Sequence, residues 1–197
     1  MTVIFSDGFE SGDFSAWDGY YADAGCSVEV ESSYPHHGSY NMKATLKGGK
    51  WALAWKTLGG AYNPAHIRAM NCRFVNVPDL TDTYRVMSFT MGEHATAAAY
   101  AGIKYYDGAW RWWIYARHNG SFVDYYGNPA SFDTPYCMEF AVYTDSSSGW
   151  ARLWVNGSLE VEATNLINKE RSLNYANIGF AYSGAGSIPA IFYADCV

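Results

Sequence analysis

The sequence predicts an all-β protein built as a two-sheet antiparallel β-sandwich. Its best apolar windows alternate with a period of two residues, which is typical of half-buried strands rather than helices. Aromatic residues make up 18% of the 197 residues, and aromatic side chains favour strands. Turn dipeptides separate the alternating segments. Ten or more such strands without helices can bury their apolar faces only as two packed sheets.

The predicted strands follow one another along the whole chain. In an early example, Met42, Ala44 and Leu46 share one face and alternate with polar residues on the other. The predicted strands span residues 28–31, 42–47, 50–56, 85–91, 99–106, 110–117, 137–145, 150–156, 158–164, 178–182 and 191–197. No repeat, linker or low-complexity tract interrupts them, so we expect one domain over residues 1–197.

Turn chemistry supports tight hairpins between several of these strands. Asp107-Gly108 separates the two most aromatic strands, and Asn156-Gly157 separates residues 151–155 from 159–163. Asn119-Gly120 marks a further reversal. Asn-Gly and Asp-Gly supply the positive φ angles that two-residue hairpin turns require.

Composition excludes several classes of partner. The chain has 13 Lys and Arg against 19 Asp and Glu, a net charge of −6, whereas nucleic-acid binding needs a clustered basic face. No segment approaches the ~18 unbroken apolar residues of a membrane helix, so membrane insertion is not expected. Residues 1–7 lack the basic and long apolar regions of a signal peptide, so none is expected in this chain. The four cysteines lack zinc-site spacing and are interpreted as free thiols, with one disulfide as the alternative.

Five segments, in order, resemble one known family. They read F-S-D-G-F-E-S-G-D-F-S-A-W at residues 5–17, H-H-G-S-Y-N-M-K-A at 36–44, Y-C-M-E-F-A-V at 136–142, A-R-L-W-V-N-G at 151–157 and I-F-Y-A-D-C-V at 191–197. This series is similar to that of concanavalin A-like, laminin-G-like jelly-roll domains. The resemblance implies a jelly-roll sandwich. It does not imply one function, because this fold carries lectins, lyases, hydrolases and structural modules.

The resemblance also implies a structural calcium site. In related jelly rolls, an acidic residue of the first strand and the aspartate of the last strand share Ca²⁺ with carbonyls of the H-S-G loop. Carried over to this sequence, Glu10 and Asp195 provide carboxylates, Gly38 or Ser39 a carbonyl, and Asp7 a further carboxylate. Calcium prefers six to eight oxygen ligands and accepts backbone carbonyls. The alternative is that these carboxylates only cap loops or pair with a lysine.

The aromatic hairpin is the candidate carbohydrate site. Alternation along residues 110–117 places Trp110, Trp112 and Ile114 on one face, which the aliphatic Ile114 marks as core. The opposite face then displays rings interleaved with guanidinium groups. Rings stack on sugar C–H faces and arginine binds carboxylates, so an acidic glycan would fit. The predicted carbohydrate-binding residues are Lys104, Tyr106, Arg111, Trp113, Tyr115 and Arg117. The alternative is a strand covered by a loop or a neighbouring subunit.

Two enzyme interpretations receive less support. Glu160 and Glu162 share a strand face, ~7 Å apart, which is near the carboxylate spacing of glycosidases. The glucanases of the similar family carry a denser E-x-D-x-E motif that is absent here. Its polysaccharide lyases use Gln, His, Tyr and Arg, and this chain has no Gln. His66 and His94 have no partner at an interpretable spacing, His118 is expected in the loop after its strand, and His36 and His37 lie in the loop of the calcium site.

The sequence therefore predicts a non-catalytic, lectin-like surface module, stabilised by calcium, whose partner is a glycan or cell-surface polysaccharide. The first alternative is a structural or decoration protein of a virion or filament, which would use the same sandwich for contacts with other protein subunits. The second alternative is a polysaccharide lyase. The expected location is extracellular or on a virion surface.

Overall fold

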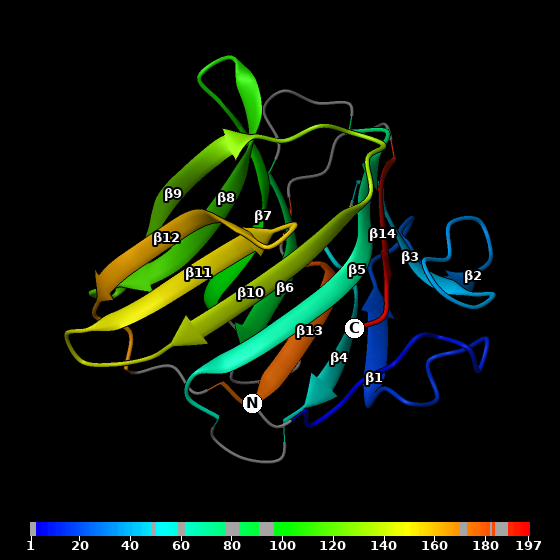
Figure 1. Cartoon of the computed structure of the whole chain (residues 1–197), viewed down its shortest axis with the longest axis horizontal. Helices are drawn as coiled ribbons and strands as arrows, with labels where there is room; N and C mark the ends of the chain where they lie inside the picture. The colour runs from blue at the N-terminus through cyan, green and yellow to red at the C-terminus, as the bar shows by residue number, and fades with distance from the viewer. Residues whose placement is uncertain are drawn as a thin grey trace.

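The computed structural model describes residues 3–48, 50–58, 62–77, 83–90, 97–169, 173–181, 183 and 189–197. Fourteen strands and no helix occur in these residues, so none holds an apolar helix of membrane-spanning length (Figure 1). The strands are β1 (Gly19–Ala22), β2 (Ser27–Glu31), β3 (Asn41–Leu46), β4 (Ala52–Thr57), β5 (Ala65–Val75), β6 (Thr83–Thr90), β7 (Ala97–Tyr106), β8 (Ala109–His118), β9 (Ser121–Pro129), β10 (Tyr136–Tyr143), β11 (Gly149–Val155), β12 (Ser158–Leu166), β13 (Tyr175–Phe180) and β14 (Ala190–Asp195).

The strands form two seven-stranded antiparallel sheets that pack face to face. Sheet I has the order β1-β4-β13-β6-β7-β8-β9, and sheet II has the order β12-β11-β10-β5-β14-β3-β2. In Figure 1, strands β10, β11 and β12 of sheet II lie in front of strands β7 and β8 of sheet I. The predicted two-sheet antiparallel sandwich is therefore confirmed.

The core lies between the two sheets and is lined by alternate residues of both. On β8, Trp110, Trp112 and Ile114 all belong to this core, as the alternation predicts. The intervening side chains of Arg111, Trp113, Tyr115 and Arg117 consequently lie on the outer face of sheet I. This assignment positions the candidate site described below.

The predicted hairpin turns are confirmed by their backbone angles. Asp107 and Gly108, between β7 and β8, have φ values of 50° and 75°. Asn119 and Gly120, between β8 and β9, have 48° and 82°. Two successive positive φ angles are characteristic of the turn whose twist matches that of the flanking strands.

Three strands were missed by the sequence analysis: β1, β5 and β9. Strand β5 spans 11 residues, between β10 and β14 in sheet II. Its alternation is weak at the sequence level because two of its inward residues, Ala65 and Ala69, are small. Its outward residues include His66 and Arg68, which shape the second groove discussed below.

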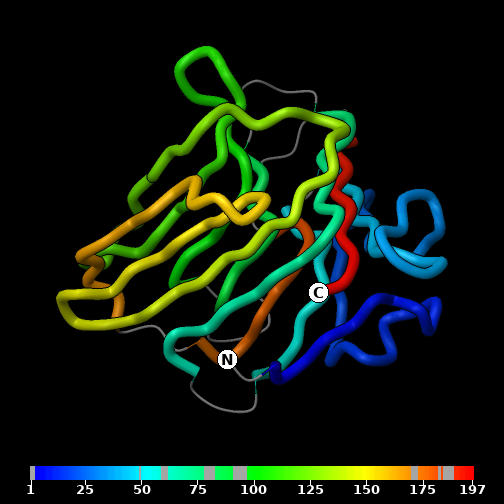
Figure 2. The backbone as a smooth tube through the Cα atoms, viewed as in Figure 1, coloured from blue at the N-terminus to red at the C-terminus, as the bar shows by residue number. Residues whose placement is uncertain are grey.

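The two ends of the described chain lie side by side. Asp7 and Val197 exchange two backbone hydrogen bonds, each of 2.9 Å. The tube in Figure 2 shows the blue first segment running close to the red C-terminal segment. This pairing fixes the segment that carries Asp7 and Glu10 beside the end of β14.

Candidate functional site on the outer face of sheet I

Strands β6 to β9 carry a cluster of aromatic and cationic side chains on the outer face of sheet I. Its central cation is Arg85, which is only 9% exposed. The pairing of β6 with β7 shifts register between Arg85 and Met87. Val86 and Met87 both enter the core. The extra residue of this bulge therefore leaves Arg85 on the outer face.

Three aromatic rings surround the Arg85 guanidinium. Its Cζ lies 5.3 Å from the ring centroids of both Tyr100 and Trp113. The same carbon lies 4.9 Å from the ring centroid of Tyr115. Such cation–π contacts contribute ~0.5–2 kcal/mol each. The guanidinium is thus held in place before a ligand arrives, which lowers the entropy lost on binding.

Lys104 adds a second cation next to Arg85 and its three rings. Its Nζ lies 2.9 Å from Asp124 Oδ2 and 5.3 Å from the Trp113 ring centroid. The other oxygen of Asp124 accepts a 2.7 Å hydrogen bond from Trp113 Nε1. Burial lowers the pKa of Lys104 and its bond to Asp124 raises it, with a net upward shift. Lys104 is therefore charged at neutral pH.

The charge of this part of the face differs from that of the chain as a whole. Among the described residues from β6 to β9 it carries four cations, Arg85, Lys104, Arg111 and Arg117, against the carboxylates of Asp107 and Asp124. The whole chain has a net charge of −6. A local cationic excess on an acidic protein favours an anionic ligand at this face.

Asn177, on the neighbouring strand β13, adds a buried amide to the same face. It is 2% exposed, and its Nδ2 donates hydrogen bonds to Thr90 Oγ1 at 3.1 Å and Ser88 Oγ at 3.3 Å. Within the described part of the chain, its Oδ1 has no hydrogen-bond partner. A buried oxygen without a hydrogen-bond partner lowers the stability of the folded state by ~1–3 kcal/mol.

The predicted carbohydrate-binding residues share the outer face, but they differ in accessibility. Tyr106 is 51% exposed and stacks on Tyr126, with ring centroids 4.0 Å apart. Tyr115 is half-buried and stacks on Phe122 at 4.5 Å. Lys104, Arg111 and Arg117 are also half-buried.

The interpretation of Trp113 needs correction. Its side chain lies on the predicted face but is 0% exposed, because Arg85, Lys104 and Tyr115 surround its indole. It therefore cannot stack directly on a sugar in this arrangement. Trp113 instead orients the neighbouring cations and Asp124.

Three residues of this site carried no predicted role: Arg85, Tyr100 and Asn177. Strict alternation would place Arg85 on the same face as Met87, in the core, and only the bulge prevents this. Asn177 joins the site through pairing with Ser88, which is distant in sequence. The one available sequence signal was an arginine inside an otherwise apolar segment.

The predicted metal ligands Glu10 and Asp195 both hold the loop of residues 36–40. Asp195 is fully buried, and its Oδ2 accepts hydrogen bonds from the backbone N–H groups of His36 at 2.6 Å and His37 at 3.0 Å. Its Oδ1 accepts another from Cys196 at 2.6 Å. Glu10 Oε1 accepts two from Ser39 and Tyr40, each 3.0 Å. Burial, and then the charge of Asp195, raise the pKa of the Cys196 thiol to about 11.

These carboxylates supply hard oxygens, as calcium requires. However, their oxygens face N–H donors, whose partial positive charge opposes a cation. Asp7 is likewise engaged, accepting from Phe9 N–H at 2.9 Å and from Trp17 Nε1 at 2.7 Å. No group of three or more His, Cys, Asp or Glu side chains in the described ranges is placed to hold a metal ion. In this arrangement the backbone N–H groups of the loop donate hydrogen bonds to the carboxylates of Glu10 and Asp195. Calcium binding stays a prediction.

The calcium prediction requires that the ion raise the melting temperature. A ligand that binds only the native state adds ~2.7 kcal/mol of stability at a hundredfold excess over its Kd. Circular dichroism melts in millimolar calcium and in EDTA provide the measurement. Equal melting temperatures in both would contradict calcium binding and leave the carboxylates as anchors of the loop alone.

The residues weighed for the two enzyme interpretations are engaged in other contacts. Glu160 accepts a hydrogen bond from Asn128 Nδ2 at 2.8 Å, and Glu162 accepts one from Arg152 Nε at 2.6 Å. His118 Nδ1 accepts a hydrogen bond from the backbone N–H of Ile167 at 3.3 Å. His94 lies outside the described residues.

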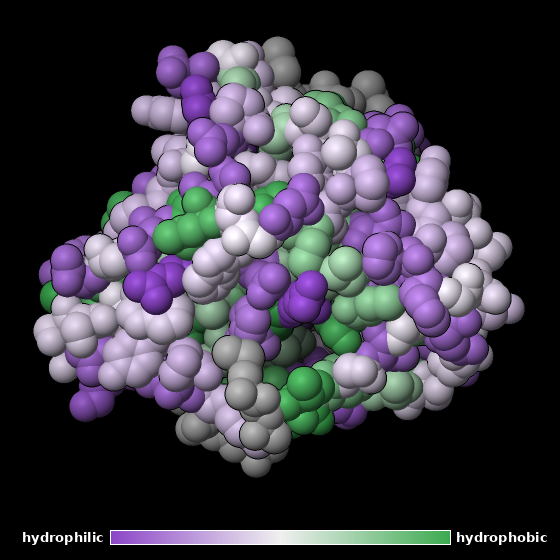
Figure 3. Space-filling model, in the orientation of Figure 1, coloured by the Kyte–Doolittle hydropathy of each residue, from purple (hydrophilic) through white to green (hydrophobic). Residues whose placement is uncertain are grey.

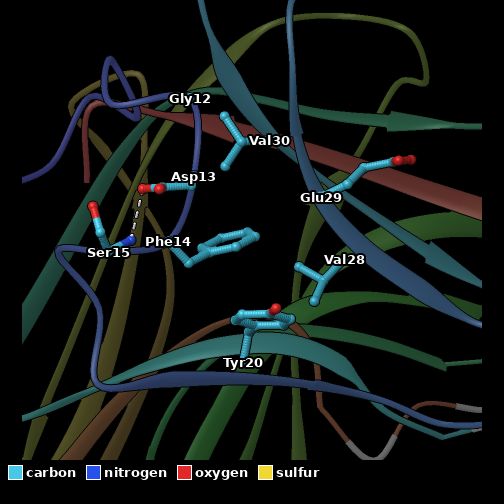
Figure 4. A pocket seen from close by; sticks show the side chains of 8 residues that line it. All are labelled: Gly12, Asp13, Phe14, Ser15, Tyr20, Val28, Glu29 and Val30. Carbon is cyan, nitrogen blue, oxygen red and sulfur yellow. Dashed lines mark hydrogen bonds between the residues drawn. The ribbon is translucent and has the colours of Figure 1, made fainter.

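A small pocket of about 440 Å³ lies between the first loop and β2. In Figure 4 the rings of Phe14 and Tyr20 lie close together beside Val28 and Val30. Its carboxylates are engaged locally: Asp13 accepts from Ser15 N–H at 2.9 Å, and Glu29 pairs with Lys43 at 3.2 Å. The pocket therefore offers an apolar surface without a set of groups suited to catalysis.

No family model matches this sequence, and no curated protein matches it. Solved structures match its fold. An endo-β-1,4-glucuronan lyase from the fungus Trichoderma reesei superposes with a TM-score of 0.70 at 13% identity, covering 99% of this chain and 94% of that one. The cellulose induced protein Cip1 superposes with 0.66 at 16%, covering 98% and 95%. Alginate lyase AlyC3 in complex with dimannuronate superposes with 0.54 at 9%, covering 80% and 73%.

These likenesses define the class of the fold. The chain is a concanavalin A-like jelly-roll β-sandwich, as the resemblance of its sequence segments implies. The superpositions establish the fold, but at sequence identities this low they do not establish an activity, which must be argued from the site.

Proposed function

We propose that this protein is a non-catalytic module that binds an acidic polysaccharide on the outer face of sheet I. The observation that carries the proposal is the Arg85 guanidinium, held among the rings of Tyr100, Trp113 and Tyr115 on the face that also carries Lys104. A guanidinium offers a planar pair of donors that matches a uronate carboxylate. The ring of Tyr106, which is 51% exposed, is accessible for stacking on a sugar C–H face.

The fold neighbours support this choice of ligand. The names of two of them, a glucuronan lyase and an alginate lyase bound to dimannuronate, refer to chains of acidic sugars. The cationic excess on strands β6 to β9 is the matching property of this chain. An extracellular or virion-surface location, where such polysaccharides are met, stays a prediction.

Replacing Arg85 with alanine is expected to weaken binding of polyglucuronate at least tenfold. A hydrogen bond to a charged group contributes ~1.5–3 kcal/mol, which corresponds to roughly 10- to 150-fold in affinity. Isothermal titration calorimetry at low and high salt measures the loss, and circular dichroism confirms that the variant is folded.

The control is Lys43→Ala, which removes one positive charge from sheet II. Lys43 pairs with Glu29 and Glu31 and is remote in sheet order from the site. Equal affinity losses in both variants would show that only net charge matters and would contradict a site at Arg85.

One observation favours a lyase as the second candidate function. The ring of Tyr115 lies next to Arg85, so a phenol and a carboxylate-neutralising cation share the face. In β-elimination, a base removes the proton beside the uronate carboxylate and the glycosidic C–O bond breaks to leave a double bond. Ultraviolet absorbance of an unsaturated uronate product, on incubation with polyglucuronate, would establish the lyase. Stable binding without product supports the module.

The structural alternative uses the same face between subunits. It predicts an oligomer in which strands β7 and β8 are protected from solvent. Sedimentation velocity with hydrogen exchange tests it directly, and a monomer that binds polyglucuronate contradicts it.

A further inference from the structure

A groove of about 1140 Å³ runs along the other side of the sandwich. It is lined by the first described segment of the chain, by residues of β5, β10 and β11 in sheet II, and by Ala176, Asn177 and Ile178 of β13 in sheet I. The space-filling view in Figure 3 shows this face hollowed at its centre, with apolar and polar side chains around the hollow. Among its described lining residues it shares Asn177 with the site on sheet I, and it includes none of that site's cations or stacking rings.

The strand register explains the floor of this groove. Ala141 on β10 pairs with His66 on β5 and with Arg152 on β11. Its short outward side chain thus lies between two large ones. The same alternation places Trp150 and Trp154 on the outer face of β11, on either side of Arg152. Successive outward positions on a strand are ~7 Å apart, so the two indoles flank the floor along its length.

The aromatic side chains are oriented by their neighbours. The Arg152 guanidinium Cζ lies 4.5 Å from the Trp150 ring centroid. The ring of Tyr143 also stacks on Trp150, with the two ring centroids 6.0 Å apart. The His66 ring meets the Trp154 ring edge to face at 6.3 Å. Rings fixed in this way lose little freedom when a flat ligand stacks on them.

The charges of the groove are balanced within it. Glu139 lies between His66, at 3.4 Å, and Arg68, at 3.7 Å. Arg152 is paired with Glu162 at 2.6 Å. Burial lowers the pKa of His66, the charge of Glu139 raises it, and the net shift is downward, which favours the neutral imidazole. Among the described lining residues, Lys56 and Arg68 are matched by Asp7 and Glu139, so this surface, in contrast to the sheet I face, has no cationic excess to offer an anion.

We infer that this groove is a second carbohydrate-binding site, selective for an uncharged glycan. Stacking rings, balanced charges and polar groups that can exchange hydrogen bonds with hydroxyls are together the chemistry that a neutral sugar chain requires. A charged polysaccharide would have to separate the existing ion pairs to gain a partner. The inference does not depend on the function proposed for sheet I.

The test is affinity gel electrophoresis in galactomannan, xyloglucan and hydroxyethylcellulose, three uncharged polysaccharides, with polyglucuronate as the charged comparison. The unaltered protein should be retarded in at least one uncharged gel. Ala141→Phe fills the floor from the outer face without entering the core. It should weaken that binding about tenfold, as should Trp154→Ala, which removes a stacking ring. Both should keep their retardation in polyglucuronate, whereas Arg85→Ala should show the opposite pattern.

Tyr21→Ala is the control for loss of an exposed ring, because Tyr21 lies on β1 in sheet I and is 41% exposed. Its binding to the uncharged gels should be unchanged. No retardation of the unaltered protein in any uncharged gel would overturn the inference, as would equal retardation of Ala141→Phe. An oligomer that Ala141→Phe converts to a monomer would assign the groove to self-association and overturn the inference too. Failure here, with polyglucuronate binding intact, leaves the sheet I proposal standing.

Discussion

Replacing Asp195 with alanine is expected to lower the free energy of unfolding by about 3–4 kcal/mol. The carboxylate is fully buried and accepts backbone hydrogen bonds from His36, His37 and Cys196. Alanine would leave three N–H groups without their acceptor. Hydrogen bonds to a charged group contribute ~1.5–3 kcal/mol each, and relaxation of the loop recovers part of the loss. Urea unfolding followed by tryptophan fluorescence provides the measurement.

The matched control is Glu10→Ala. Glu10 accepts bonds from the same loop but is exposed, so water can replace its oxygens and the expected loss is about 1 kcal/mol. A smaller loss for Asp195→Ala than for Glu10→Ala would show that burial does not govern this loop.

Replacing Gly102 with alanine is expected to cost about 2–3 kcal/mol of stability and to abolish high-affinity polyglucuronate binding. Gly102 pairs with Arg85 at the bulge. A Cβ there would overlap the Tyr84 carbonyl oxygen and approach the Arg85 Cα. Because these are backbone atoms, β6 and β7 must move apart, and the Arg85 guanidinium must leave its aromatic neighbours.

Gly8→Ala is the corresponding control, because the nearest atom to its added Cβ would be Glu10 Cγ at 3.9 Å. Thermal melts and calorimetry compare the two variants. If Gly102→Ala kept both the melting temperature and the affinity, the tight approach of β6 and β7 would have no part in holding Arg85.

The candidate site was only partly predictable. Alternation along β8 correctly separates Ile114, in the core, from Tyr115, on the outer face, since successive side chains of a strand point to opposite sides. It cannot distinguish an accessible ring from a covered one. Trp113 is covered because β6 and β7 bring Arg85 and Lys104 over it. Which strands are neighbours is a property of the sheet order, which no local pattern contains.

Arg85 shows that alternation can also assign a side chain to the wrong face of a strand. A bulge breaks the alternation of β6 and moves the guanidinium out of the core. Bulges depend on how two strands pair, and Gly102, which permits this one, lies on a different strand. The groove on sheet II was missed for a related reason. Its floor exists because Ala141 is paired between Arg152, on the next strand of the chain, and His66, on a strand distant in sequence.

The sequence by itself determined the all-β class, the tight turns and the side of β8 that enters the core, because alternation and positive φ angles are local properties of the chain. The tertiary structure alone decided which rings stay accessible, where the cations gather and where a groove opens. Those features arise when the antiparallel pairing of distant strands sets side chains next to one another, and they follow the order of the two sheets.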